Sequence, residues 1–248
     1  MIPTVRILGI NFSKLTLQDT VSLICNKVNQ NDNKFFHIIT VNPEIAIQIH
    51  EDTELKEISL KADMLTPDGV GIVWASRLLR NPVPERVTGY DLLLESLKQG
   101  NKNNWSFYFL GSEEHVNKNM ENHVFINYPN IKIVGRHNGF FDKAEEEKII
   151  QEIESLCPDI LIVAFGAPLT DKWINRHRDK IKAKVVFGVG GSMDVITGKV
   201  QRTPAIWKKL NLEWLHRRII MPERKGRQKR LKVFALKVIK EALAGHEE

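Results

Sequence analysis

The sequence has few cysteines and no long hydrophobic run, and both absences limit what the protein can be. Only two of its 248 residues are cysteine, Cys25 and Cys157, and they stand in no metal-binding or redox spacing. This usage is typical of the reducing cytoplasm. The N-terminal segment lacks a basic region followed by a long apolar stretch, which disfavours a signal peptide. Apolar runs such as 160–164 are far shorter than the roughly 20 residues that cross a bilayer, so any membrane contact is expected to be peripheral.

Familiar site motifs are also absent. There is no Asp-x-Asp, and the eight histidines include no His-Glu-x-x-His or similar spacing, so we expect no metal site. The chain has neither the phosphate loop nor the full dinucleotide fingerprint. It also lacks a helix-turn-helix, zinc or RNA-binding signature, which disfavours a nucleic-acid partner.

The pattern that is present is an alternation of helices and strands. Hydrophobic residues make up 42% and charged residues 27%, which is ordinary for a globular chain with a buried core. Between about 15 and 192, strands are predicted at 35–41, 64–66, 105–110, 131–135, 159–165 and 184–189, with helical patterns between them. Such alternation predicts an α/β fold with mostly parallel strands joined by right-handed crossovers.

Polar and glycine-rich segments follow several of these strands. Because ligands bind at the carboxyl ends of parallel strands, we predict a site there. Asp68, in the tight turn 66–69, is the leading candidate for a general base, since a carboxylate partly removed from water is a stronger proton acceptor. The alternative interpretation is an aspartate that serves only the turn or a helix cap. Thr40 and Asn42 are candidates to bind substrate hydroxyls, and Asn42 equally fits the cap of a helix that starts at Pro43.

Two further segments carry candidate ligand contacts. Arg86, Thr88, Gly89 and Asp91 open a predicted helix, and a helix N-terminus beside an arginine suits phosphate or ribose. The alternative is a capping box beside a solvated arginine. The run 188–191 holds Gly188, Gly190 and Gly191, which permit close approach of backbone to a ligand.

A basic segment dominates the last fifty residues. Residues 217–237 contain nine Lys or Arg and one acid, Glu223, a surplus that exceeds the net charge of +6 of the whole chain. Such a segment favours phosphate on a membrane, a nucleic acid or a diphosphate ligand. Without a metal, an enzyme that releases a diphosphate needs arginine or lysine to neutralise it. Arg217, Arg224 and Arg227 are the candidates, with a solvated basic face as the alternative.

We predict that residues 1–197 form the core and residues 198–248 a basic helical appendage. One face of its last helix is apolar and is made of Leu231, Phe234, Ala235, Val238 and Ala242. This face fits an anionic membrane surface. The alternative is packing on the protein's own core or on another subunit.

The order and spacing of these motifs resemble the TagA/WecG/CpsF glycosyltransferases over nearly the whole chain. The segments that carry the resemblance are Thr-Val-Asn-Pro-Glu at 40–44, Thr-Pro-Asp-Gly-Val-Gly at 66–71, Arg-Val-Thr-Gly-Tyr-Asp at 86–91, Phe-Leu-Gly at 109–111, Asn-Gly-Phe-Phe at 138–141, Gly-Ala-Pro at 166–168 with Trp173, Gly-Val-Gly-Gly at 188–191 with Asp194, and Leu-Glu-Trp-Leu at 212–215 with Arg217.

The resemblance implies an inverting, metal-independent transferase without a cofactor, built on a Rossmann-like α/β core with helices on both faces. UDP-N-acetylmannosamine is the implied donor, and the implied acceptor is the 4-hydroxyl of N-acetylglucosamine on undecaprenyl diphosphate, for the teichoic acid linkage unit. Asp68 matches the proposed catalytic base, Thr40 and Asn42 lie near the sugar, and the three appendage arginines close over the diphosphate. Peripheral binding to the anionic inner face of the cell membrane and a possible homo-oligomer are implied as well.

One departure from the family pattern leaves the donor open. Thr170 stands where a glutamine is usual, so a UDP-N-acetylmannosaminuronate or another UDP-hexosamine is an alternative donor. The alternatives of another class are a non-catalytic nucleotide-binding or nucleic-acid-binding protein. The substrate-binding set predicted from the sequence is Thr40, Asn42, Arg86, Thr88, Asp91, Gly111, Gly166, Thr170, Gly188, Gly190, Gly191, Arg217, Arg224 and Arg227.

Overall fold

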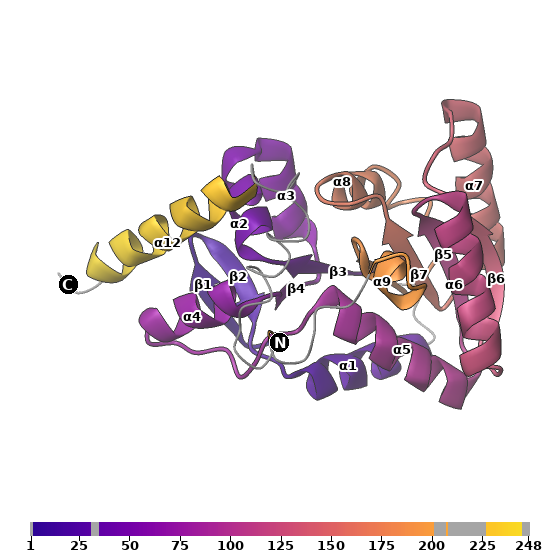
Figure 1. The fold of residues 1–248 in the computed structure, drawn as a ribbon, viewed down its shortest axis with the longest axis horizontal. Coiled ribbons are helices and arrows are strands. Elements are labelled where there is room, and N and C mark those ends of the chain that lie inside the picture. The colour runs from indigo at the N-terminus through magenta and orange to yellow at the C-terminus, as the bar shows by residue number, and fades with distance from the viewer. Residues whose placement is uncertain (1, 31–34, 201–206, 208–226, 245–248) are drawn as a thin grey trace.

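The computed structural model describes residues 2–30, 35–200, 207 and 227–244. The strands within them are β1 (Thr4–Ile7), β2 (Ile10–Ser13), β3 (Phe36–Val41), β4 (Met64–Pro67), β5 (Ser106–Gly111), β6 (Lys132–His137), β7 (Ile160–Ala164) and β8 (Val185–Gly188). The helices are α1 (Leu17–Asn29), α2 (Pro43–Glu51), α3 (Thr53–Lys61), α4 (Val70–Leu78), α5 (Gly89–Asn103), α6 (Glu114–Asn127), α7 (Lys143–Leu156), α8 (Leu169–Arg176), α9 (Ser192–Ile196) and α12 (Arg227–Ala244) (Figure 1).

Six strands form one sheet in the order β4-β3-β8-β7-β5-β6, and every neighbouring pair is parallel. Strands β1 and β2 form a separate antiparallel hairpin. The last strand in sequence, β8, lies between β3 and β7, so strands from both halves of the core meet in the middle of the sheet. The prediction of a Rossmann-like α/β core with a mostly parallel sheet is confirmed.

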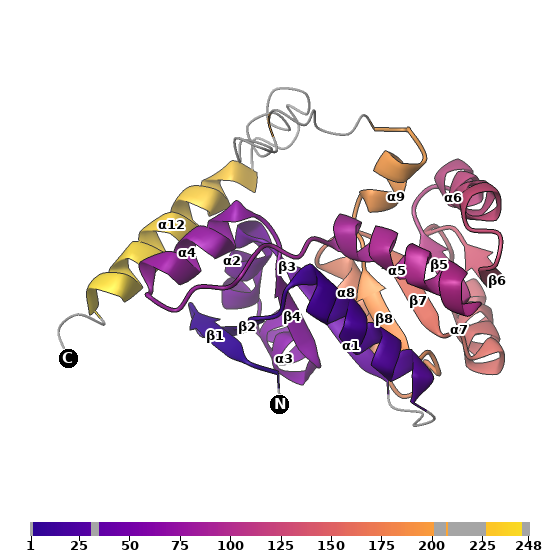
Figure 2. The same ribbon diagram turned by 90° about the horizontal axis from the view of Figure 1, so that it is seen from below.

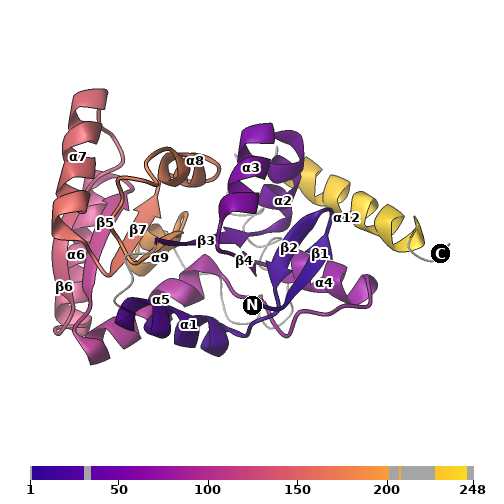
Figure 3. The ribbon, with the colours of Figure 1, turned by 180° about the vertical axis from the view of Figure 1, so that it is seen from behind.

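Helices cover both faces of the sheet, as predicted. On one face, Ile38 and Phe107 belong to a core cluster shared with α1, α5, α6 and α9. On the other, Ile39 packs with α2, α3 and α4, and Tyr108 packs with α7 and α8. Figure 2 shows α1 and α5 side by side on the first face, and Figure 3 shows α3 beside α8 on the second. Strands buried on both faces are typical of a parallel sheet.

The C-terminal helix α12 packs on the protein's own core. Phe234 and Val238 are 2% and 0% exposed, and they join the cluster formed by α2 and α4. At the far end of the helix, the Glu241 carboxylate accepts a hydrogen bond of 2.9 Å from the backbone N–H of Leu8. Of the two interpretations of this apolar face, core packing is correct, and a membrane contact made by Phe234 and Val238 is wrong because protein atoms already cover them. The boundary at 197/198 remains a prediction.

The helices among the described residues are all too short or too polar to cross a bilayer.

Candidate active site

The carboxyl ends of the six parallel strands share one edge of the sheet, and the connections there diverge. Strand β3 is followed by α2 on one face, whereas its neighbour β8 is followed by α9 on the opposite face. The same divergence separates β7, followed by α8, from β5, followed by α6. Ligands of open α/β sheets bind where neighbouring connections part in this way. The fold therefore has two such switch points, one between β3 and β8 and one between β7 and β5, which we call the first and the second crevice.

Asp68 directly follows β4, which pairs with β3, one of the two strands that border the first crevice. Its backbone N–H donates to the carbonyl of Val41 at 3.0 Å, which joins the turn to the end of β3. A Cβ atom on Gly71 would lie 2.6 Å from Cγ of Pro43, so only glycine lets the start of α4 pack this closely on the start of α2. Asp68 is half-buried there. Asp68 thus lies at the carboxyl end of β4, and its role as a general base stays a prediction.

The loop before α5 is fastened to the same place. Thr66 Oγ1 donates to the carbonyl of Val87 at 3.1 Å, and the N–H of Val87 donates to the carbonyl of Pro67 at 2.9 Å. A Cβ on Gly89 would lie 3.2 Å from Oγ1 of Thr40. These contacts bring the segment that contains the half-buried Arg86 to the ends of β3 and β4, beside Asp68 and Thr40.

Two predicted binding side chains are helix caps. Asn42 Oδ1 accepts a hydrogen bond of 3.0 Å from the N–H of Ile45, and Thr88 Oγ1 accepts one of 3.0 Å from the N–H of Asp91. Thr88 Oγ1 also donates to the Asp91 carboxylate at 2.8 Å. The cap interpretations of Asn42 and of Thr88 with Asp91 are therefore confirmed, and a substrate contact by each stays a prediction. The caps aim the positive ends of α2 and α5 at the strand edge, where they favour an anion.

The glycines of the strand ends divide into two groups. A Cβ on Gly111 would lie 2.6 Å from the carbonyl of Ala164, and one on Gly188 would lie 2.7 Å from Cγ2 of Thr170, so packing alone requires glycine at both positions. Gly166 and Gly190 instead have φ of +81° and +49°, and a Cβ on either would meet no atom of the described residues within 4 Å. Within the part of the chain that the structure describes, the second pair therefore offers bare backbone with no neighbouring side chain against it. Gly191, the cap residue of α9, lies next to Gly190.

Thr170 serves the protein's own loop. Its side chain is 4% exposed, and its Oγ1 accepts a hydrogen bond of 3.1 Å from the N–H of Phe165. The hydroxyl thus holds the turn between β7 and α8. The predicted sugar contact of Thr170 remains a prediction, made by a group that already has a protein partner.

A buried amide that was not among the residues predicted from the sequence lies beside the second crevice, at the ends of β5 and β6. Asn117 of α6 is 0% exposed, and its Nδ2 lies 2.9 Å from the carbonyl of Gly111, 2.9 Å from that of His137 and 3.2 Å from that of Phe109. One side chain therefore ties the ends of β5 and β6 together. The helical pattern around Asn117 does not predict this role, because the carbonyl groups that the side chain binds belong to strands distant in sequence.

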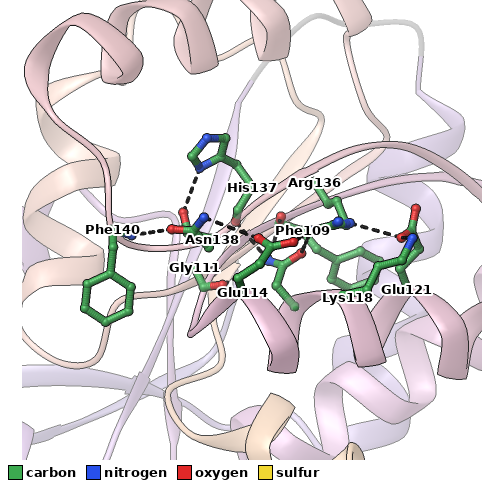
Figure 4. A network of polar contacts seen from close by, with 10 residues as sticks. Phe109, Gly111, Glu114, Lys118, Glu121, Arg136, His137, Asn138 and Phe140 are labelled. Carbon is green, nitrogen blue, oxygen red and sulfur yellow. Dashed lines mark hydrogen bonds and ion pairs between the residues drawn. The ribbon is translucent and has the colours of Figure 1, made fainter.

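The same network holds the loop after β6. Arg136 donates to Glu114 at 2.8 Å, and this hydrogen bond lowers the pKa of the Glu114 carboxyl. Asn138 donates to Glu114 at 3.3 Å and accepts from the N–H of Phe140 at 2.8 Å (Figure 4). The Phe140 ring is 74% exposed. These hydrogen bonds therefore hold the loop after β6 in place, with the exposed Phe140 ring at the edge of the second crevice.

The remaining predicted residues belong to the appendage. Arg217 and Arg224 lie outside the described residues. Arg227 is the first residue of α12, and the structure describes its backbone but not its side chain. Within the described ranges, His, Cys, Asp and Glu side chains form no group of three that could hold a metal ion.

The chain is similar to curated proteins along nearly its whole length. It is 35% identical over 237 residues to the N-acetylglucosaminyldiphosphoundecaprenol N-acetyl-beta-D-mannosaminyltransferase of Staphylococcus aureus strain MRSA252, covering 95% of this chain and 92% of that protein. Identity to the protein of the same name from strain NCTC 8325 / PS 47 is 34%, with the same coverage. The family described as glycosyl transferase WecG/TagA/CpsF matches residues 5–248. The chain is therefore a glycosyltransferase that belongs to the WecG/TagA/CpsF family.

Proposed function

We propose that this glycosyltransferase moves N-acetylmannosamine from its UDP derivative to the 4-hydroxyl of N-acetylglucosamine on undecaprenyl diphosphate. The name shared by the Staphylococcus aureus relatives, at 34–35% identity over 95% of the chain, supports this donor sugar and acceptor. The observation that carries the proposal is the position of Asp68. A hydrogen bond from its backbone N–H to Val41 joins Asp68 to the end of β3, next to Thr40. The product is the disaccharide lipid of the teichoic acid linkage unit.

Asp68 acts as the general base in this proposal. Its carboxylate takes the proton of the acceptor hydroxyl while the hydroxyl oxygen attacks the anomeric carbon of the donor. The bond from that carbon to the UDP oxygen breaks on the opposite side, so the configuration inverts and UDP leaves with the electron pair. Holding both substrates at adjacent strand ends lowers the entropy cost of their encounter.

Positive groups at the strand edge meet the charge that develops on UDP. The capped N-terminus of α5 and Arg86 lie at the first crevice, and open backbone at Gly166 and Gly190 lies at the ends of β7 and β8. Arg217, Arg224 and Arg227 complete the set, as predicted from the sequence, and no metal is used. The exposed Phe140 ring supplies a flat apolar surface for the uracil base at the β5 end.

The acceptor places the enzyme at a lipid surface. An undecaprenyl chain stays in the bilayer, so the strand edge must meet a diphosphate at the level of the head groups. We propose peripheral binding at the anionic inner face of the cell membrane, with charge attraction from the C-terminal basic segment. A homo-oligomer at that surface is compatible with the same account.

The direct test is release of UDP from UDP-N-acetylmannosamine, with and without lipid-linked N-acetylglucosamine and in the presence of a chelator. The proposal expects release that requires the acceptor and does not require a metal. If UDP is released only from UDP-N-acetylmannosaminuronate, that compound is the donor in place of UDP-N-acetylmannosamine. This donor is included because Thr170 stands where a glutamine is usual. UDP binding with no release from any donor of a UDP-hexosamine panel would mean a non-catalytic nucleotide-binding protein.

A further inference from the structure

The outward face of α12 differs from the face that packs on the core. Glu241 is the only acid within Arg227–Ala244, and its carboxylate is turned towards the backbone of Leu8. Arg230 lies 3.6 Å from the carboxylate of Glu51 in α2. Among the side chains of α12 that the structure describes, the exposed ones are mainly apolar or cationic: Val233, Leu236, Ile239 and Leu243, with Lys229, Lys232 and Lys240 among them. Leu236 and Leu243 are 68% and 66% exposed.

Helix α4 has an outward face of the same character. Trp74 and Leu78 are 42% and 36% exposed, and Arg77 is exposed between them, whereas Ile72 and Ala75 are buried on the core side. Residues 69–84 include no Asp or Glu. Exposed tryptophan and leucine beside arginine are typical of a helix that lies in the interface of a bilayer.

The two faces belong to neighbouring helices. Contacts join α4 to α12, and Figures 1 and 2 both show the two helices side by side. The exposed side chains of these two helices include leucine, isoleucine and tryptophan among lysine and arginine, and the acid of α12 is turned towards Leu8. Lipid head groups of negative charge complement such a surface, because apolar side chains enter the acyl boundary while the cationic heads stay at the phosphates.

We propose that α4 and the outward face of α12 form one docking face for an anionic lipid surface, and that α4 is a membrane-contacting element in its own right. The inference deepens the proposed function, on which it rests for its biological meaning. Its consequence is geometric: α4 begins directly after Asp68 and Gly69, and at nine residues it is only about 13 Å long. Docking through α4 thus fixes the height of the proposed base above the phosphates of the bilayer.

The test uses the full chain and vesicles of phosphatidylglycerol mixed with phosphatidylcholine, without substrate. We expect Trp74→Gln combined with Leu78→Gln to weaken vesicle partitioning about tenfold and to leave the melting temperature unchanged. The matched control is Phe125→Gln with Ile126→Gln on α6, where both side chains are more exposed, at 79% and 75%. This control should bind vesicles as the unmodified chain does. Arg77→Glu should weaken binding at low salt and lose its effect at high salt.

Activity separates this inference from the proposed function. For the Trp74 and Leu78 variant, transfer to an acceptor embedded in vesicles should fall in parallel with binding, while transfer to a water-soluble short-chain acceptor stays normal. Unchanged vesicle binding of this variant would overturn the inference. So would an effect confined to the oligomeric mass of the lipid-free protein, because the face would then bind a second copy. Vesicle binding that depends on α4 without any transfer by the unmodified chain would leave the docking face standing and refute the proposed function.

Discussion

The backbone N–H of Asp68 donates to the carbonyl of Val41 across 3.0 Å, so the turn after β4 is held against the end of β3. Val41 precedes Asn42, the cap of α2, and follows Thr40. The residue that bears the carboxylate is therefore joined by a backbone hydrogen bond, independent of the substrate, to the segment that holds Thr40 and the cap of α2. Such preorganisation is what a general base needs in order to face a bound hydroxyl.

Replacing Asp68 with asparagine should lower kcat by about 10²–10⁴-fold, because the amide cannot accept the proton of the acceptor hydroxyl. UDP affinity, measured by calorimetry, should stay unchanged, since the shape of the side chain is kept. Asp52→Asn is the control: Asp52 caps α3, and asparagine caps a helix equally well. Near-normal turnover of Asp68→Asn would remove Asp68 from the role of base.

Gly188 and Thr170 should be energetically coupled. Gly188→Ala brings a methyl group to 2.7 Å from Cγ2 of Thr170 and should destabilise the fold by about 1–3 kcal/mol. Thr170→Ser removes that Cγ2 but keeps the hydroxyl that accepts from Phe165. In the double variant the cost of Gly188→Ala should shrink, which a double-mutant cycle of urea unfolding measures. Additive costs would show that the two residues do not share this space.

Asn117→Ala should reduce both stability and donor binding. The substitution leaves the carbonyls of Gly111 and His137 without their buried donor, which should cost about 3 kcal/mol in the free energy of unfolding. The ends of β5 and β6 then lose their fixed spacing, so the KM for the UDP-sugar should rise more than kcat falls. The matched control is Asn127→Ala on the same helix, where the amide is exposed. Loss of stability with unchanged KM would separate Asn117 from the donor crevice.

Stability should decline in strong alkali through Tyr108. Burial, with Glu152 close by, raises the pKa of the Tyr108 phenol above its usual value of 10.0, and its hydroxyl donates to Glu152 at 3.0 Å. The unfolded chain therefore loses this proton at a lower pH than the folded one. The stabilisation is complete below pH 10 and should fall as pH rises beyond it. Urea unfolding of Tyr108→Phe should show a shallower decline above pH 10 than the unmodified chain, and equal slopes would contradict this assignment.

The parts of the site that could be predicted from the sequence depend on neighbours in the chain. Asn42 before Pro43, and Thr88 three residues before Asp91, are local cap signals, and both form as predicted. Asp68 was found because it follows a strand pattern within a tight turn. Each of these signals lies within a few residues of the group it positions.

The parts that could not be predicted depend on residues distant in sequence. Asn117 binds carbonyls of β5 and β6, and Gly188 makes room for Thr170, contacts that appear only once β8 is inserted beside β7. The sequence also did not predict which surface the apolar face of α12 contacts, because a phenylalanine such as Phe234 packs equally well against lipid and against a protein core. Helical periodicity reveals an apolar face, but only the fold shows what covers it.

The most direct test of the central claim is the structure of the product. After incubation of the enzyme with UDP-N-acetylmannosamine, lipid-linked N-acetylglucosamine and a chelator, the acceptor should gain the mass of one N-acetylhexosamine, joined through a β linkage to the 4-hydroxyl. Asp68→Asn should form almost none of it in the same time. An unmodified acceptor alongside consumed donor, or an α-linked product, would contradict an inverting transfer to this lipid.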